Sequence, residues 1–323
     1  MDKSVRLFVA AYAFSEDGAT HFLLPGREVK LEGAEEVLPI LLRQCDGYRM
    51  AEEIVSLTAE ETGYAQAELW ELVEQLLARQ VLIGSTQHYL FFHRVSANPM
   101  PFSHQFSEEE IARMLAEGES FLMQSSLQPT TSLEKLLARR ESTREFTGEF
   151  LSQQEAERLA WAIYGKTPRA NSFPESAIGL GTVPSGGALY PLRLFVLKPS
   201  NKEREWECFR AGSEGLEKTV TTTYEALVRV FLNDSNLLEG VGAVYVLACE
   251  FQQTTQKYAN RGYRYAILEA GHAAQNAYLW CVEQGLGVVE VGGFYDEELA
   301  QLLSLSYPDQ APLTTLLVGR RKQ

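Results

Sequence analysis

The stretch from about residue 265 to residue 283 constrains the fold more than any other part of the chain. Its small and apolar residues fall on nearly every side of a helix, which Gly285 then ends. A helix that is apolar all round is buried, either in a large core or in a subunit interface. We therefore expect a buried helix and a dimer, with His272 as a hydrogen-bonded core residue. The apolar positions are Ala266, Ile267, Ala270, Ala273, Ala274, Ala277 and Leu279.

Strand patterns surround this helix from about residue 132 onward. Apolar runs at 194–197, 243–249, 288–291 and 315–318 are typical of strands. A capping box from Ser152 to Glu155 begins another helix, which stops at Gly165. This alternation predicts an α+β domain over residues 132–323.

The first 95 residues show a different order of elements. Strand patterns at 5–14 and 21–24 precede helical patterns at 34–43, 51–61 and 66–79, and a short strand at 81–83 follows. This order indicates a small winged-helix-like domain over residues 1–95. Residues 96–131 contain several prolines, serines and threonines and form a connector, which one helix interrupts at the capping box Ser107–Glu110.

Several functions can be set aside from composition and missing motifs. A formal net charge of −14 argues against nucleic-acid binding, which needs a basic surface. No apolar run approaches the roughly 20 residues of a membrane helix, and the N-terminus does not fit a signal peptide. We therefore expect a cytoplasmic protein without membrane contact. The four cysteines and five histidines lack the spacing of metal ligands and no HExxH motif occurs, so we expect no metal site. The sequence also contains neither a phosphate-binding P-loop nor a GxSxG nucleophile motif.

Two segments have the composition of a ligand site. The segment RESTREF (residues 140–146) places two arginines around a serine, which can surround a phosphate with donors, although it also fits a solvated basic patch. The segment PSGGALYP (residues 184–191), called the glycine loop below, has consecutive glycines. Such glycines let backbone N–H groups approach a planar ligand, although most such segments are ordinary loops.

Two further segments add charged, aromatic and glycine residues. In KYANRGYRY (residues 257–265) a lysine precedes a tyrosine at the start of the long helix. A lysine beside a tyrosine can produce a base that works near neutral pH, although most such neighbours lie on the surface by chance. The segment VGGF (291–294) lies at the end of a predicted strand, where glycines permit close backbone approach to a ligand. The segment GRR (319–321) lies near the C-terminus, and its arginines fit either a phosphate site or a free tail.

In this order and spacing, the segments resemble the nitroreductase-like flavoproteins, specifically the branch of SagB-type or McbC-type azoline dehydrogenases. The resemblance covers about residues 132–323. RESTREF is similar to the R-x-S-x-[RK]-x-F opening that contacts the FMN phosphate in this fold. PSGGALYP replaces the PSxxNxQPW-like stretch of ordinary nitroreductases and fits the azoline branch better. The motifs that carry the resemblance are PSGGALYP, KYANRGYRYAILEAGHAAQN, LGVVEVGGF and the closing LLVGR.

The resemblance implies a central mixed sheet flanked by helices and a homodimer that binds FMN at the subunit interface. It implies that Lys257 and Tyr258 form a catalytic pair. Pro184, Ser185 and Gly186 would line one side of the isoalloxazine ring, and Gly292 and Gly293 would lie near its nitrogens. The residues that match phosphate contacts are Arg140, Ser142, Arg144 and Arg320. The N-terminal unit is similar to winged-helix peptide-recognition domains of ribosomal peptide-modifying enzymes.

The activity implied by the resemblance is a two-electron oxidation of a thiazoline or oxazoline ring in a peptide to a thiazole or oxazole. The peptide would be either a ribosomal precursor or a chain on a nonribosomal carrier protein. Tyr258 would serve as the base and Lys257 would position it, or the roles would be reversed. The alternatives are an NAD(P)H-dependent nitro or quinone reductase, and a flavin-containing accessory protein that binds peptides.

Overall fold

A computed structural model of the chain describes residues 6–24, 27–84, 93, 109, 113, 128–167 and 180–322. Nearly all of the connector, including Ser107, Glu108 and Glu110 of the expected helix, lies outside these residues. Within the described ranges, no helix combines the length and the apolar character that crossing a membrane requires.

The N-terminal unit contains three helices and two small sheets. Its core is formed by apolar residues such as Phe22, Leu38, Leu41 and Val73. The three expected helices are present, and the closing strand follows them. Strands β4 and β5 were not expected, because turn-forming residues begin β5 and charged residues alternate in β4. The first sheet has the order β5-β1-β6 and the second the order β2-β3-β4. The elements are β1 (Arg6–Val9), β2 (Tyr12–Glu16), β3 (Ala19–Leu24), β4 (Arg27–Glu32), α1 (Leu38–Gln44), β5 (Asp46–Met50), α2 (Ala51–Thr62), α3 (Gln66–Ala78) and β6 (Leu82–Gly84).

A six-stranded sheet of order β11-β10-β9-β12-β14-β13 organises the C-terminal part. The expected α+β class is confirmed, and all four expected strands lie in this sheet. The resemblance implies a mixed sheet, whereas each described pairing between these six strands is antiparallel. Strands β9, β10 and β11 turn back on one another directly, which gives antiparallel neighbours. The strands are β9 (Leu192–Pro199), β10 (Glu205–Gly212), β11 (Gly215–Thr223), β12 (Ala243–Glu250), β13 (Leu286–Val291) and β14 (Gln310–Arg320).

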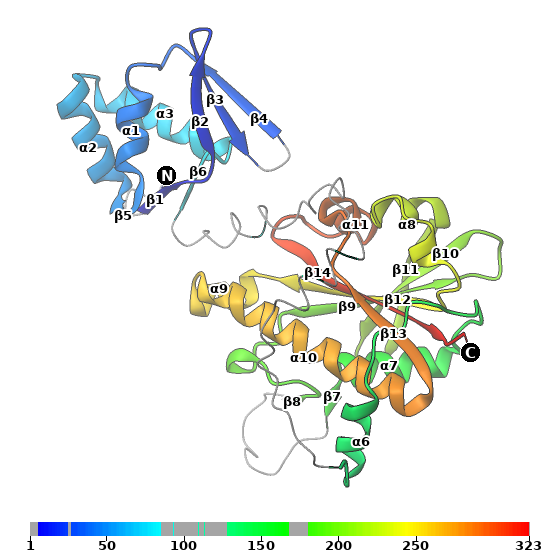
Figure 1. The fold of residues 1–323 in the computed structure, drawn as a ribbon. Coiled ribbons are helices and arrows are strands. Elements are labelled where there is room, and N and C mark those ends of the chain that lie inside the picture. The colour runs from blue at the N-terminus through cyan, green and yellow to red at the C-terminus, as the bar shows by residue number, and fades with distance from the viewer. Residues whose placement is uncertain are drawn as a thin grey trace.

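Helices cover both faces of this sheet (Figure 1). On one face, α7 (Gln153–Tyr164) and α10 (Arg261–Gln284) pack against the sheet around Tyr245. On the other face, α8 (Tyr224–Val230) and α11 (Asp296–Leu302) form a second core with the opposite side chains of the same strands. Ser152 caps α7 through the expected capping box with Glu155. The sheet is therefore the middle layer of a three-layer domain.

Within a single chain, helix α10 is buried on one side and exposed on the other. Its alanines face the core, whereas Ile267 is 45% exposed and Leu268 is 55% exposed. His272 is exposed and is not a core residue. The sheet covers one side of α10, although apolar residues lie on both sides of this helix. On the nearby helix α6 (Ser132–Arg139), Leu133 and Leu137 are exposed as well.

Candidate functional site

Three of the segments singled out from the sequence leave the sheet at the same end. Strand β9 begins where β12 ends, because Leu192 is paired with Cys249. The start of β14 is paired with the end of β12, and β13 runs antiparallel to β14 and ends at Val291, opposite Thr315 in the middle of β14. The glycine loop precedes β9, the Lys-Tyr segment follows β12, and the Gly-Gly pair follows β13. The topology thus gathers these segments, although they are far apart in the sequence.

The Lys-Tyr pair lies directly against the glycine loop. Lys257 and Tyr258 end helix α9 (Gln252–Tyr258), and the lysine Nζ lies 5.1 Å from the centre of the tyrosine ring. A Cβ atom on Gly187 would lie 2.4 Å from Tyr258 Oη and 2.8 Å from Lys257 Nζ. The backbone of Gly187 also has φ 65°, which favours glycine. Both catalytic candidates therefore face a stretch of backbone that has no side chain.

The preceding glycine of the loop, Gly186, is packed against a tyrosine that the sequence analysis did not single out as a site residue. A Cβ on Gly186 would lie 3.2 Å from Cδ2 of Tyr265, in the first turns of α10. The Tyr265 and Tyr258 rings meet edge to face, with centroids 5.0 Å apart. The Gln253 amide donates a hydrogen bond to the Leu189 carbonyl and so connects α9 to the loop. The loop is held from two sides.

Unusual backbone conformations accumulate where these segments meet. Ala188 and Tyr190 in the glycine loop have φ 54° and φ 47°. Ala259, directly after the Lys-Tyr pair, has φ 47° and ψ −140°. Non-glycine residues rarely adopt positive φ, and such strain tends to occur at functional sites, where the surrounding structure maintains it. The clustering on both sides of one contact marks this end of the sheet as the candidate site.

The predicted phosphate segment is organised around a tyrosine of α10. The Ser142 and Tyr278 hydroxyl oxygens are 3.0 Å apart, and the Arg140 guanidinium lies 5.4 Å from the centre of the same ring. The Tyr278 hydroxyl also accepts a hydrogen bond from the Glu290 N–H at 2.9 Å. Arg144 is exposed further along the segment. Arg140 and Ser142 therefore both contact Tyr278, a residue that the sequence analysis did not single out.

Arg320 and Arg321, near the C-terminus, contact carboxylates of different segments. Arg320 donates to Glu155 at 2.8 Å and lies 3.5 Å from Glu149, so carboxylates at the start of α7 hold its guanidinium. Burial acts to raise the pKa of Glu155, but the capping bonds of Ser152 and the ion pair lower it overall. Arg321, which was not predicted as a site residue, reaches the phosphate segment, where it donates to Glu141 at 2.6 Å.

The glycines after β13 leave open space. A Cβ on Gly292 would meet nothing within 4 Å, and one on Gly293 would lie 3.4 Å from Cδ1 of Leu232. Packing against the described residues therefore does not explain why residue 292 is a glycine. Pro184, at the start of the glycine loop, is exposed.

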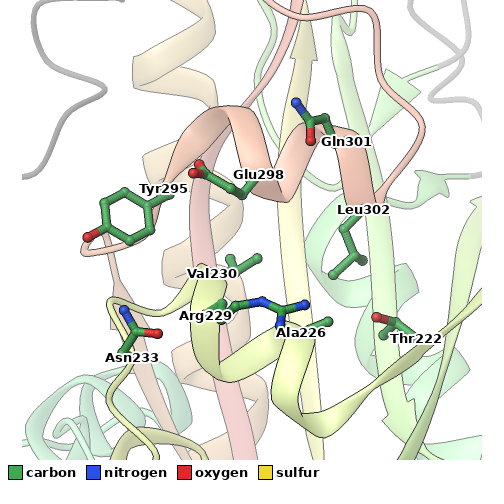
Figure 2. Close-up of a pocket in the computed structure, with 9 residues that line it drawn as sticks. All are labelled: Thr222, Ala226, Arg229, Val230, Asn233, Tyr295, Glu298, Gln301 and Leu302. Carbon is green, nitrogen blue, oxygen red and sulfur yellow. The ribbon is translucent and has the colours of Figure 1, made fainter. Parts of the chain in front are cut away.

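Two hollows are lined mostly by residues that the sequence analysis did not select, although Tyr190 of the glycine loop borders the second. One of about 470 Å³ is bounded by α8 on one side and α11 on the other (Figure 2). Its lining residues are Thr222, Ala226, Arg229, Val230, Asn233, Tyr295, Glu298, Gln301 and Leu302. A smaller one of about 300 Å³ is lined by Tyr164, Gly165, Lys166, Leu180, Gly181 and Tyr190, beside the short strands β7 (Lys166–Thr167) and β8 (Leu180–Gly181).

Comparison with known proteins identifies the wider family. A nitroreductase-family protein of Methanocaldococcus jannaschii is 32% identical over 200 residues, which cover 58% of this chain and 91% of that protein. The microcin B17-processing protein McbC of Escherichia coli is 31% identical over 157 residues. That alignment covers 46% of this chain and 58% of McbC, so it spans little more than half of that relative.

A solved structure shares the fold across most of the chain. It is the Escherichia coli microcin synthetase McbBCD complex with truncated pro-MccB17 bound, and it matches with a TM-score of 0.56 at 24% identity. The match covers 82% of this chain and 97% of the other chain. The sequence profile of the Nitroreductase family matches residues 137–320, which is more than half of the 323 residues. The chain therefore belongs to the nitroreductase family.

Proposed function

We propose that the chain is a cytoplasmic, FMN-dependent oxidase that converts thiazoline or oxazoline rings of a peptide into thiazoles or oxazoles. The observation that carries the proposal is the contact of Lys257 and Tyr258 with the backbone of Gly187. Proteins of the nitroreductase family are oxidoreductases that generally bind a flavin. The similarity to the microcin B17-processing protein McbC favours a peptide substrate over a free nitro compound.

The residues present fit FMN. Arg140 and Ser142, which meet on Tyr278, offer a guanidinium and a hydroxyl to an anionic phosphate. The glycine loop offers backbone without side chains to a flat ring, and Gly292 leaves space within 4 Å of its Cβ position. When bound, FMN would accept a hydride from the substrate ring and pass the electrons to oxygen.

The roles of the protein's own groups follow from their positions. Tyr258 would remove the acidic ring proton next to the exocyclic carbonyl of the azoline, and the loss of a hydride from the neighbouring carbon makes the ring aromatic. Lys257, whose Nζ lies 5.1 Å from the Tyr258 ring centre, would hold the phenol in place. The reverse assignment, with Lys257 as the base, uses the same geometry.

The exposed side of α10 supports a homodimer. Ile267 and Leu268 expose about half of their surface on this helix, and Leu133 and Leu137 of α6 are similarly exposed. Large apolar residues gathered on one surface commonly mark a subunit interface. We propose that a second copy of the chain covers them. We also propose that the winged-helix-like unit of residues 1–95 binds the leader of a ribosomal precursor or docks a carrier protein.

A second function remains a candidate because of one observation. The nitroreductase-family protein of Methanocaldococcus jannaschii is 32% identical, and the alignment covers 91% of its length but only 58% of this chain. This favours an NAD(P)H-dependent reductase of nitro compounds or quinones.

Anaerobic mixing separates the possible functions. FMN-loaded protein is combined either with a peptide that contains one thiazoline or with NADPH, and the visible flavin absorbance is followed. Bleaching by the thiazoline peptide with formation of a thiazole supports the oxidase. Bleaching by NADPH alone establishes the reductase instead. A flavin that neither reagent reduces indicates an accessory protein, and failure to take up FMN contradicts the proposal.

A further inference from the structure

A buried carboxyl group lies behind the glycine loop. Glu269 of α10 is only 2% exposed and is surrounded by the apolar core between α10, α7 and the sheet. Burial raises the pKa of Glu269, although the nearby Ser185 hydroxyl and the hydrogen bond from Tyr164 oppose this effect. A carboxyl group is costly to bury, and an apolar residue of similar volume often gives equal or greater stability. Core packing therefore does not explain why residue 269 is a glutamate.

The first oxygen of this carboxyl group is connected to the end of the loop. The Tyr164 hydroxyl donates a hydrogen bond to Glu269 Oε1 at 2.6 Å. The same hydroxyl accepts the N–H of Leu192, the first residue after the loop, at 3.3 Å. Burial raises the pKa of Tyr164, and Glu269 raises it further, so the phenol keeps the proton that it donates.

The carboxyl group also lies near Ser185, at the beginning of the loop. Glu269 Oε2 is buried and has no hydrogen-bond partner among the described residues. The Ser185 hydroxyl is close enough to the carboxyl group to lower its pKa. Ser185 Oγ accepts the N–H of Tyr190 at 2.9 Å, which leaves the hydroxyl proton to be donated. The Tyr190 ring in turn meets the Tyr164 ring edge to face, at 6.1 Å between centroids.

We infer that Glu269 is the positioning residue of the glycine loop, because it holds the end of the loop through the Tyr164 hydroxyl and its buried carboxyl group lies beside Ser185 at the start of the loop. The network holds Gly186 and Gly187 against Tyr265, Tyr258 and Lys257, although neighbouring loop residues have strained backbones. Glu269 itself touches neither of the glycines by any described hydrogen bond and acts through other residues. This inference rests on the proposed function, in which the loop lines FMN.

Three variants and one control test the inference. Glu269→Leu removes both acceptors, Tyr164→Phe removes the bridging hydroxyl, and Glu269→Gln keeps an acceptor for Tyr164. The control, Tyr245→Phe, removes a fully buried hydroxyl from the same core, because Tyr245 donates to the Ala156 carbonyl at 3.1 Å and not to the loop. FMN affinity is measured by titration of the apo-protein, and stability by urea unfolding of the same samples.

Glu269→Leu and Tyr164→Phe should each weaken FMN binding by about tenfold or more. Glu269→Gln should stay within about threefold of the wild-type affinity, and so should Tyr245→Phe even where its stability falls. Wild-type affinity in both the Leu and the Phe variants overturns the inference. So does an equal loss in Tyr245→Phe, because a general loss of stability would then explain the effect.

Amide hydrogen exchange of the apo-protein tests the network independently of FMN. The amides of Tyr190 and Leu192 should exchange at least about tenfold faster in Glu269→Leu than in the wild type, and the Gln variant should restore protection. If the wild type takes up no FMN but this pattern is found, the proposed function fails while the positioning role stands. Unchanged exchange at both amides overturns the positioning role, whatever the protein binds.

Discussion

Gly187 lies so close to Tyr258 that one added carbon atom would overlap the phenol, since a Cβ there would be 2.4 Å from Oη. Such an atom would also lie 2.8 Å from Lys257 Nζ. Gly187→Ala should therefore displace the pair and reduce turnover at least about tenfold. Steady-state oxidation of a thiazoline peptide measures the effect. Gly285→Ala is the matched control, because Gly285 has φ 70° but nothing within 4 Å of its Cβ position. Equal losses in the two variants would attribute the effect to backbone strain alone.

The catalytic assignment of the Lys-Tyr pair has a separate test. Lys257→Ala and Tyr258→Phe should retain bound FMN, yet each should reduce turnover at least about tenfold, because proton transfer contributes 10²- to 10⁴-fold in such reactions. Absorbance of the purified variants reports the flavin, and single-turnover reduction reports the chemistry. Variants without FMN would make the pair structural, and wild-type turnover would remove the pair from catalysis.

The phosphate segment can be tested by comparing FMN with riboflavin, which lacks the phosphate. Arg140→Ala and Ser142→Ala should each weaken FMN binding by about tenfold and leave riboflavin binding nearly unchanged, because hydrogen bonds to charged groups contribute about 1.5–3 kcal/mol. Arg320→Ala should show a smaller difference, since Glu155 and Glu149 compete for its guanidinium. Fluorescence titration provides both affinities. Equal losses for the two ligands would place these residues away from the phosphate.

Asp296 should make the stability of the protein depend on pH. Burial raises the pKa of this carboxyl group from 3.8 to about 8. Between these values the folded protein retains a proton that the unfolded chain has released, so stability falls as pH rises. The contribution is at most about 1.4 kcal/mol per pH unit. The imidazole of His93, with Nε2 3.8 Å from Oδ1, opposes the shift when it is protonated.

Urea unfolding at several pH values between about 4 and 8 measures this slope, and Asp296→Asn should flatten it. Asp309→Asn, at an exposed position, controls for the loss of one carboxylate. A slope that persists in Asp296→Asn, or that disappears equally in Asp309→Asn, would mean that other groups cause it.

The parts of the fold that the sequence predicted are those in which local chemistry decides the structure. Ser152 and Glu155 form their capping box within four consecutive residues, and Gly285 ends α10 with φ 70°. The central strands β9 and β12 are buried on both faces and therefore appear as apolar runs. Strands β10 and β11 were not expected, because they lie at one side of the sheet and alternate with exposed charged and polar residues.

The site was predictable in its segments but not in its contacts. Lys257, Tyr258 and the glycine loop were selected from the sequence, and the topology brings them together. Tyr278 and Glu269 were not selected, because each lies on a helix whose other residues signal only burial. Ser142 lies 136 residues before its partner Tyr278, and Tyr164 lies 105 residues before its partner Glu269, so no local pattern encodes these pairings. A single carboxylate on the apolar side of α10 was the one signal available for Glu269.

Helix α10 has two functional sides separated by a single residue step. Leu268 points to solvent with 55% of its surface exposed, while its neighbour Glu269 is 2% exposed behind the glycine loop. In the proposed dimer, a subunit contact on one side would stiffen the support of the loop on the other. Thermodynamic linkage then requires that subunit association strengthen FMN binding and that FMN binding strengthen subunit association. Dilution would then dissociate the subunits and release FMN, so the apparent FMN affinity would depend on the protein concentration.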